Sequence, residues 1–329
     1  MRLRALLLKL TKGDWFTPAL LLMILLGWLI PGPGIKSGLF SLKQLAEFGI
    51  SVIFFLYGLR LSVKQLIHCV TQWRLHLVIQ SVTFIIFPVI ILLLRPLFAY
   101  GPFSDLWLGV FFLAALPSTV SSAVVMVSLA GGNIPGAVFN ATVSSIAGIL
   151  ITPLWMGFFI QGSEGGADIL PVFIKLTYQI LVPMVLGILL HPRFGELAIR
   201  KKDFTRYFDQ SVVLAIVYTS FSSSFSSGIF KGYGMVVILL LILFLILFFL
   251  AIIFIIRYLT RLAGLGREDM ITTMFCGSTK SLMHGTVMAK VLLNNAATVG
   301  LLLLPILIYH ALQLVFTGFM SQRFARKIW

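Results

Sequence analysis

Apolar runs of about 20 residues follow one another along the chain, separated by short polar or glycine-bearing segments. A helix needs about 20 apolar residues to cross the hydrocarbon core of a bilayer, so each run predicts a membrane-spanning helix. The ten predicted spans cover about 15–30, 42–61, 73–94, 105–132, 134–160, 169–190, 208–230, 233–256, 268–293 and 296–320. We therefore expect an all-α polytopic membrane protein.

Two spans, the fourth and the ninth, are interrupted by polar residues. The fourth contains Leu116–Asn133 (LPSTVSSAVVMVSLAGGN) and the ninth contains Phe275–Lys290 (FCGSTKSLMHGTVMAK). Proline or glycine beside a serine cluster indicates a break, and the backbone groups that a break frees persist in a membrane only where they face protein, water or a ligand. We predict that these two broken helices together build a binding site. A simple proline or glycine kink is the alternative.

Composition places the chain in lipid. Charged residues make up 11% of it, against about a quarter in soluble domains, and the mean hydropathy is +1.06. The net charge is +15, and most of the Lys and Arg residues lie at span ends on one side of the predicted topology. That asymmetry sets membrane orientation and attracts lipid headgroups; it does not indicate nucleic acid. We expect an inner-membrane protein with both termini in the cytoplasm.

The arrangement of spans suggests an internal repeat. Six spans precede the basic segment 191–206, a predicted cytoplasmic loop, and four follow it. Divided after the fifth span, the ten spans form two halves of five with opposite orientations. Residues 1–190 would hold the first repeat and the sixth span, and 207–329 the rest of the second repeat. Inverted repeats of this kind are typical of secondary transporters.

Lys280 is the most conspicuous single residue. An unpaired ammonium at the bilayer centre costs about 2.5–3.5 kcal/mol on insertion scales, so its position needs an explanation. It either faces a cavity, as the partner of a substrate anion or as a fixed positive charge, or pairs with Asp209 or Glu47. His284 lies one helical turn further on and either titrates or packs.

The polar residues of the two interrupted spans are the predicted substrate site. Ser118-Thr119 is followed by Asn133, and Ser278-Thr279 by Asn294, at nearly the same spacing. The residues predicted to bind substrate are Thr119, Asn133, Ser278, Lys280, His284 and Asn294.

No pattern of hydrolytic or redox chemistry is found. There is no phosphate-binding loop, no His-Glu-x-x-His and no serine elbow, and the cysteines Cys69 and Cys276 lack metal or disulfide spacing. We expect neither an enzyme nor a cofactor, and no metal site is certain. Gln80, Asn140 and Ser144 carry oxygens inside apolar spans, which either coordinate sodium or bond one helix to another.

Several motifs together resemble one transporter family. They are Tyr57-Gly58-Leu59-Arg60-Leu61, Gln80, Pro117–Ser122 with Gly132-Asn133, and Phe275–Leu282. Over nearly its whole length the chain resembles the bile acid:sodium symporter family. It is most similar to a divergent branch of bacterial symporters that is related to a vertebrate orphan carrier.

The resemblance implies ten helices in two inverted five-helix repeats. It implies a panel of spans 1, 2, 6 and 7 and a core of spans 3–5 and 8–10, with spans 4 and 9 crossing at their breaks. It also implies sodium as a possible coupling ion. The implied cation or coupling residues are Gln80, Ser121, Ser122, Asn140, Ser144, Thr279, Lys280 and Ser281.

One departure from the family pattern affects the coupling. The family's span-nine glutamate would fall near Phe275 or Cys276, where this chain has no acid. Lys280 follows a few residues later, and its charge disfavours a nearby cation. We hypothesise that Lys280 replaces one sodium.

We therefore expect a secondary transporter that moves a small organic anion by alternating access, with sodium coupling in doubt. Two alternatives stay open: a sodium- or proton-coupled cation carrier in which Lys280 pairs with a coupling acid, and a non-transporting membrane regulator. The sequence leaves the oligomeric state and the substrate's identity open.

Overall fold

The computed structural model describes residues 16–36, 41–60, 72–98, 103–160, 177–293 and 296–325, and within these ranges every regular element is a helix. The elements are α2 (Phe16–Leu29), α3 (Gly32–Ile35), α4 (Leu42–Arg60), α6 (Trp73–Ser81), η2 (Val82–Ile86), α7 (Phe87–Leu93), η3 (Arg95–Phe98), α8 (Phe103–Ala115), α9 (Ser121–Ala130), α10 (Ile134–Ile160), η4 (Thr177–Leu181), α12 (Val182–Arg200), α13 (Lys202–Ser226), η5 (Ile229–Gly232), α14 (Met235–Leu262), α15 (Arg267–Ser278), α16 (Leu282–Leu292) and α17 (Ala296–Ala325).

Six helical stretches are long and apolar enough to cross a membrane. They are Leu42–Arg60, Trp73–Leu93, Ile134–Phe159, Tyr178–Arg200, Met235–Leu262 and Thr298–Ala325. Apolar side chains also cover much of their outer surface, as expected where lipid is the solvent. The chain is therefore a multi-pass membrane protein.

Both predicted breaks are confirmed. The fourth span divides into α8, which ends at Ala115, and α9, which begins at Ser121. The ninth span divides into α15, which ends at Ser278, and α16, which begins at Leu282. Gly131 closes α9 with a left-handed φ of 71°, a conformation that glycine adopts without steric cost.

The predicted loop at 191–206 is wrong. Helix α12 continues to Arg200 and α13 begins at Lys202, so only Lys201 separates them. The segment reads as a loop because it is basic, but Arg, Lys, Glu, Leu and Ala favour a helix, and Arg193, Arg200 and Arg206 are exposed on the helix surface. The predicted loop 161–168 and the first residues of the sixth span, 169–176, lie outside the described residues.

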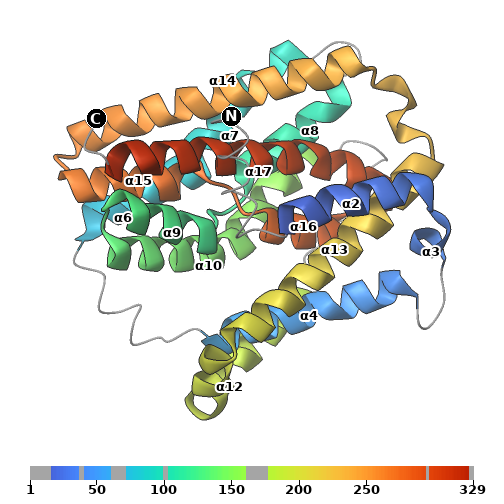
Figure 1. Cartoon of the computed structure of the whole chain (residues 1–329), viewed down its shortest axis with the longest axis horizontal. Coiled ribbons are helices and arrows are strands. Elements are labelled where there is room, and N and C mark those ends of the chain that lie inside the picture. The colour runs from blue at the N-terminus through green and yellow to red at the C-terminus, as the bar shows by residue number, and fades with distance from the viewer. Residues whose placement is uncertain are drawn as a thin grey trace, which may run out of the picture.

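Five helices form a first group, α2, α3, α4, α12 and α13, joined by their packing on one another. Helices α4 and α12 approach with their backbones almost in contact. A Cβ atom on Gly58 would overlap the Met184 carbonyl oxygen, and one on Gly187 would overlap that of Phe55. In Figure 1 the blue α4 and the olive α12 lie together at the bottom of the view, the yellow α13 runs from them up to the right, and the orange α14 lies along the top.

The second group consists of α6 to α10 and α14 to α17, and α13 of the first group packs against α16 and α17 of the second. Ser224 of α13 packs so tightly against Gly300 of α17 that a Cβ there would overlap the serine Oγ. Glu47 of α4 forms an ion pair with Lys290 of α16 at 3.5 Å. The serine run 220–227 is thus a close-packing surface between helices.

Candidate functional site

The two helix breaks meet and bond to each other, and we call this meeting point the crossing. The backbone N–H of Ser281 donates to the Pro117 carbonyl oxygen at 2.9 Å. The Ser118 hydroxyl donates to the Cys276 carbonyl oxygen at 2.6 Å, and the Ser118 N–H donates to Ser144 Oγ at 2.9 Å. Each break therefore satisfies backbone groups that the other leaves without an intrahelical partner.

Helix α17 braces the break in the ninth span. The Gln313 side chain accepts a hydrogen bond from the Lys280 N–H at 2.8 Å and donates one to the Lys280 carbonyl oxygen at 3.0 Å. The Tyr309 hydroxyl donates to the Ser278 carbonyl oxygen at 2.7 Å. Sequence reasoning missed both residues. The sequence does place a tyrosine and a glutamine four positions apart, on one face of an apolar span, and this spacing could have indicated a polar contact inside the protein.

The Lys280 ammonium lies inside a cage of carbonyl oxygens. It donates to the carbonyls of Thr83 at 2.7 Å, Ala114 at 2.7 Å and Leu116 at 2.8 Å. The Phe87 ring covers it, with the Nζ atom 4.0 Å from the ring centroid. An ammonium has three N–H donors, so each donor has one carbonyl acceptor. The residue is 1% exposed.

These carbonyls are available because the helices that carry them are irregular. Ala114 and Leu116 lie where α8 ends, and the last carbonyls of a helix have no intrahelical partner. Thr83 lies in the π-helical turn η2, an arrangement frequent at functional sites. Converging carbonyl oxygens and helix ends of this kind hold Na⁺ in broken-helix transporters. The lysine thus fills a cage whose chemistry suits a monovalent cation.

Several predicted cation residues bond to one another. Gln80 Nε2 donates to Asn140 Oδ1 at 3.2 Å, and Asn140 Nδ2 lies 2.8 Å from His76 Nδ1. Ser144 accepts from Ser118, as described above. Thr279 Oγ1 donates to the Phe275 carbonyl oxygen at 2.9 Å. The bonds of Asn140 join α6 to α10, and Ser144 joins α10 to the break before α9, whereas the Thr279 bond stays within the end of α15.

The break in the fourth span contains three further predicted residues. Ser122 Oγ donates to Thr119 Oγ1 at 3.1 Å, so both hydroxyls lie at the start of α9. Ser121 is the first residue of that helix, and its side chain is not among those that the structure describes. Thr119 and Ser122 therefore bond to each other at the break before α9.

Asn133 lies apart from the crossing. Its Oδ1 accepts from the Gly136 N–H at 2.9 Å at the start of α10, and its Nδ2 donates to Asp269 Oδ1 at 2.8 Å at the start of α15. It thus joins two helix starts. Ser278 lies at the crossing, with its hydroxyl bonded to the Met274 carbonyl oxygen at 2.5 Å. Asn294 lies outside the described residues.

His284 and Ser281 lie where the broken ninth span faces α4. The Ser281 hydroxyl accepts from the His284 N–H at 3.3 Å and lies 2.9 Å from His284 Nδ1. The Tyr57 ring of α4 stacks on the imidazole at 5.4 Å between centroids. His284 Nε2 is buried and has no hydrogen-bond partner in the described structure.

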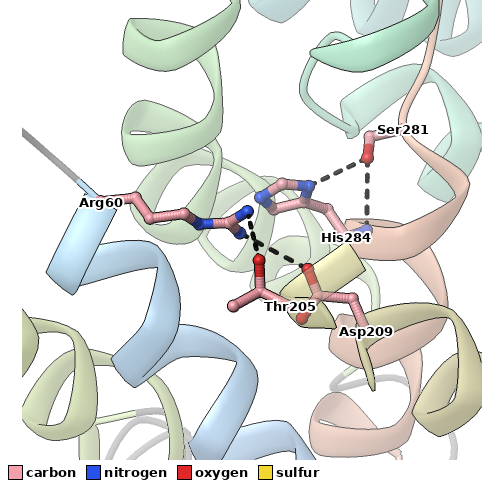
Figure 2. A network of polar contacts seen from close by, with 5 residues as sticks. All are labelled: Arg60, Thr205, Asp209, Ser281 and His284. Carbon is pink, nitrogen blue, oxygen red and sulfur yellow. Dashed lines mark hydrogen bonds and ion pairs between the residues drawn. The ribbon is translucent and has the colours of Figure 1, made fainter. Parts of the chain in front are cut away.

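Arg60 is the last residue of α4. Its guanidinium donates to Thr205 Oγ1 at 3.1 Å and lies 3.5 Å from Asp209 Oδ2. The guanidinium carbon is 5.2 Å from the centroid of the Tyr57 ring. Figure 2 shows the side chains of Arg60, Thr205, Asp209 and His284 converging from α4, α13 and α16.

Neither acid proposed as a partner of Lys280 has that role. Glu47 pairs with Lys290, and Asp209 pairs with Arg60. The cation that Lys280 carries is therefore balanced by carbonyl dipoles. No group of three or more His, Cys, Asp or Glu residues suited to a metal ion occurs in the described ranges.

Comparisons with known proteins place the chain among transporters. The sequence model of the SBF-like CPA transporter family matches residues 14–326. A protein of Pseudomonas aeruginosa described as uncharacterized is 38% identical over 314 residues, which is 95% of this chain and 93% of that protein. "Putative symporter YfeH" of Escherichia coli is 32% identical, covering 95% and 93%. "Sodium/bile acid cotransporter 7" of Danio rerio is 30% identical, covering 92% and 91%.

Proposed function

This chain belongs to the SBF-like CPA transporter family, and on that premise we propose that it is a secondary transporter that moves a small organic anion across the inner membrane by alternating access. The contact between two broken helices supports the proposal, because transporters commonly bind substrates and ions with backbone groups that a helix break exposes in mid-membrane. The symporter and cotransporter names of the relatives agree with it.

We further propose ten spans arranged as two inverted repeats, with both termini in the cytoplasm. In support, the fourth and ninth spans are each broken near their middle and bond to each other there. Two segments that occupy corresponding positions in the two halves and share a break are the pattern that inverted repeats produce.

The observation that carries the coupling proposal is the carbonyl cage around Lys280. In our proposal the ammonium takes the place of a sodium ion, so transport is not driven by sodium through this site. A second cation about 4 Å from the ammonium would be repelled by about 4 kcal/mol at an effective dielectric constant near 20. Such repulsion is about as large as the binding free energy of a site with a dissociation constant of about 1 mM, about 4 kcal/mol.

Thermal stability of the purified protein in NaCl against choline chloride tests this proposal. A ligand at about 100 times its dissociation constant stabilises the folded state by about 2.7 kcal/mol. We expect no sodium-specific rise in the melting temperature of the wild type and a clear rise in Lys280→Ala, because the substitution empties the cage.

Lys290→Ala is the matched control, since Lys290 is the other buried lysine of the ninth span and lies outside the cage. It is expected to show no sodium response. A sodium-specific rise in melting temperature of the same size in the wild type and in Lys280→Ala would contradict the coupling proposal.

A further inference from the structure

A groove of about 610 Å³ runs between α6 with its π turn η2 and α10. All of its lining residues belong to the second helix group, so the groove lies within that group and not at the boundary with the first. They are Trp73, His76, Leu77, Gln80, Ser81, Phe84, Ile85, Phe139, Ile151 and Trp155.

Contacts between the two helices hold the groove in shape. The rings of His76 and Phe139 lie 4.3 Å apart between centroids. Further along, the Trp155 indole N–H donates to the Phe84 carbonyl oxygen at 2.9 Å. Because side chains join α6 and η2 to α10 at both places, the groove is a formed feature of the fold.

Polarity changes along the groove. The polar lining residues, His76, Gln80 and Ser81, all come from α6, before the π turn. From Phe84 onward the lining is apolar or aromatic. Ligand sites of about 300–1,000 Å³ are commonly lined in this way, by mostly apolar residues with a few polar ones. The groove therefore suits an amphipathic ligand whose apolar part lies toward Trp155.

Arg74 provides a positive charge at the polar end. Its guanidinium carbon lies 5.5 Å from the ring centroid of Trp73, which lines the groove. Both side chains are exposed at the start of α6, and Arg74 forms no ion pair with the acids of the described residues. Tryptophan and arginine at the end of a span are typical of the headgroup level of a bilayer.

We propose that this groove binds an anionic phospholipid, with one acyl chain between α6 and α10 and the phosphate on Arg74. The twelve residues from Trp73 to Ile85 correspond to about 18 Å of helix at about 1.5 Å per residue. One leaflet of the hydrocarbon core is about 15 Å deep, half of about 30 Å. The groove is thus about as long as one leaflet is deep.

Charge and surroundings favour a lipid over a soluble ligand. Leu77 and Ile85 are lining residues that are more than half exposed, on a helix apolar enough to span the membrane. Acyl chains therefore surround the groove from the outset, and basic side chains at span ends attract anionic headgroups. A chain in the groove also lies against η2, whose Thr83 carbonyl oxygen bonds to Lys280.

Native mass spectrometry of the full chain, purified and delipidated in detergent, counts bound lipid. The probes are phosphatidylglycerol and the zwitterionic phosphatidylcholine with identical acyl chains, and glycerol 3-phosphate as a headgroup without chains. We expect the first phosphatidylglycerol to bind about fivefold more tightly than phosphatidylcholine, since one arginine near an anionic lipid contributes about 1 kcal/mol. Glycerol 3-phosphate should not bind.

Arg74→Gln tests the headgroup contact. It should abolish the preference for phosphatidylglycerol while phosphatidylcholine binds as before. Arg323→Gln is the matched control, because the Arg323 guanidinium also stacks on an aromatic ring, that of Phe319 at 4.3 Å, and Arg323 does not line the groove. It should keep the preference.

Leu77→Trp tests the acyl-chain contact. The larger side chain fills part of the groove, so both lipids should bind several-fold more weakly. Leu154→Trp is the matched control, because Leu154 is 62% exposed on α10, against 60% for Leu77, and does not line the groove. It should leave the binding of both lipids unchanged.

Four results would overturn the inference. They are equal binding of the two lipids to the wild type, a preference that Arg74→Gln retains, equal effects of Leu77→Trp and Leu154→Trp, and binding of glycerol 3-phosphate as tight as that of phosphatidylglycerol. Should Leu77→Trp fail to fold, the wild type and Arg74→Gln still decide the outcome. The measurement needs neither substrate nor sodium, so its result is independent of the transport and coupling proposals.

Discussion

At the scale of single residues, Lys280 shows how a charge is accommodated in an apolar interior. Its ammonium is balanced by three carbonyl dipoles and an aromatic face, and no carboxylate of the described residues forms an ion pair with it. The sequence indicates that this lysine needs a partner. It suggests the acids Asp209 and Glu47, because residue types reveal side-chain partners and not backbone ones. Carbonyl partners come from backbone irregularity, which residue types specify only indirectly.

The brace provided by Gln313 leads to a stability prediction. Gln313→Leu removes the partners of both the N–H and the carbonyl of Lys280, and each buried backbone group without a partner costs about 1–3 kcal/mol. We expect a loss of about 2–4 kcal/mol in the free energy of unfolding, seen as a lower melting temperature in detergent.

Gln44→Leu is its control, because Gln44 lies exposed on α4. Gln313→Glu keeps the acceptor and loses the donor, so an intermediate melting temperature is expected. Equal melting temperatures for Gln313→Leu and Gln44→Leu would contradict the role given to this side chain.

At the scale of elements, the hydrophobic pattern predicts the helices well. The fifth span, predicted at 134–160, coincides with α10, and both helix breaks occur where serine clusters follow proline or glycine. Two features of the helices are not predicted by the hydrophobic pattern. The π turn at Val82–Ile86 leaves hydrophobicity unchanged, and the basic stretch at 191–206 reads as a loop although its residues continue two helices.

The packing of α4 on α12 is the most sensitive contact between elements. Gly58→Ala places a methyl group onto the Met184 carbonyl oxygen, and backbone atoms cannot give way without moving the helix. Overpacking of this kind costs about 1–3 kcal/mol, so we expect a lower melting temperature and a smaller folded fraction after extraction.

Gly157→Ala in α10 provides the comparison. A Cβ there meets no atom within 4 Å, and alanine favours a helix over glycine by about 1 kcal/mol. Its melting temperature should be unchanged or raised. Equal destabilisation by both substitutions would contradict the close approach of α4 and α12.

At the scale of the whole molecule, the two helix groups meet where α13 packs against α16 and α17 and where α4 faces α16. Glu47–Lys290 and the His284–Tyr57 stack join α4 to α16, and Ser224 against Gly300 joins α13 to α17. Alternating access, as we propose it, requires such contacts to break and re-form. Hydropathy alone indicates that the spans exist, but pairing across the boundary depends on the register of helices far apart in sequence.

The Glu47–Lys290 pair tests this boundary. The Lys290 side chain is 3% exposed and that of Glu47 is 39% exposed, so solvent screens part of the interaction. Glu47→Gln should lower stability by about 1–2 kcal/mol, because it leaves a buried ammonium less well balanced. In a double-mutant cycle, Lys290→Met should remove most of that effect.

Independent, additive effects of Glu47→Gln and Lys290→Met would show that the two side chains do not interact. The cycle is measured on purified protein by thermal unfolding, so it needs no substrate.

The most direct measurement of the central claim, that a tethered ammonium occupies a cation site, is saturable binding of radiolabelled sodium to the purified protein. The account predicts no saturable binding in the wild type or in Lys290→Ala, and binding in Lys280→Ala that unlabelled sodium displaces and choline does not. Saturable binding to the wild type at the level found in Lys280→Ala would contradict it.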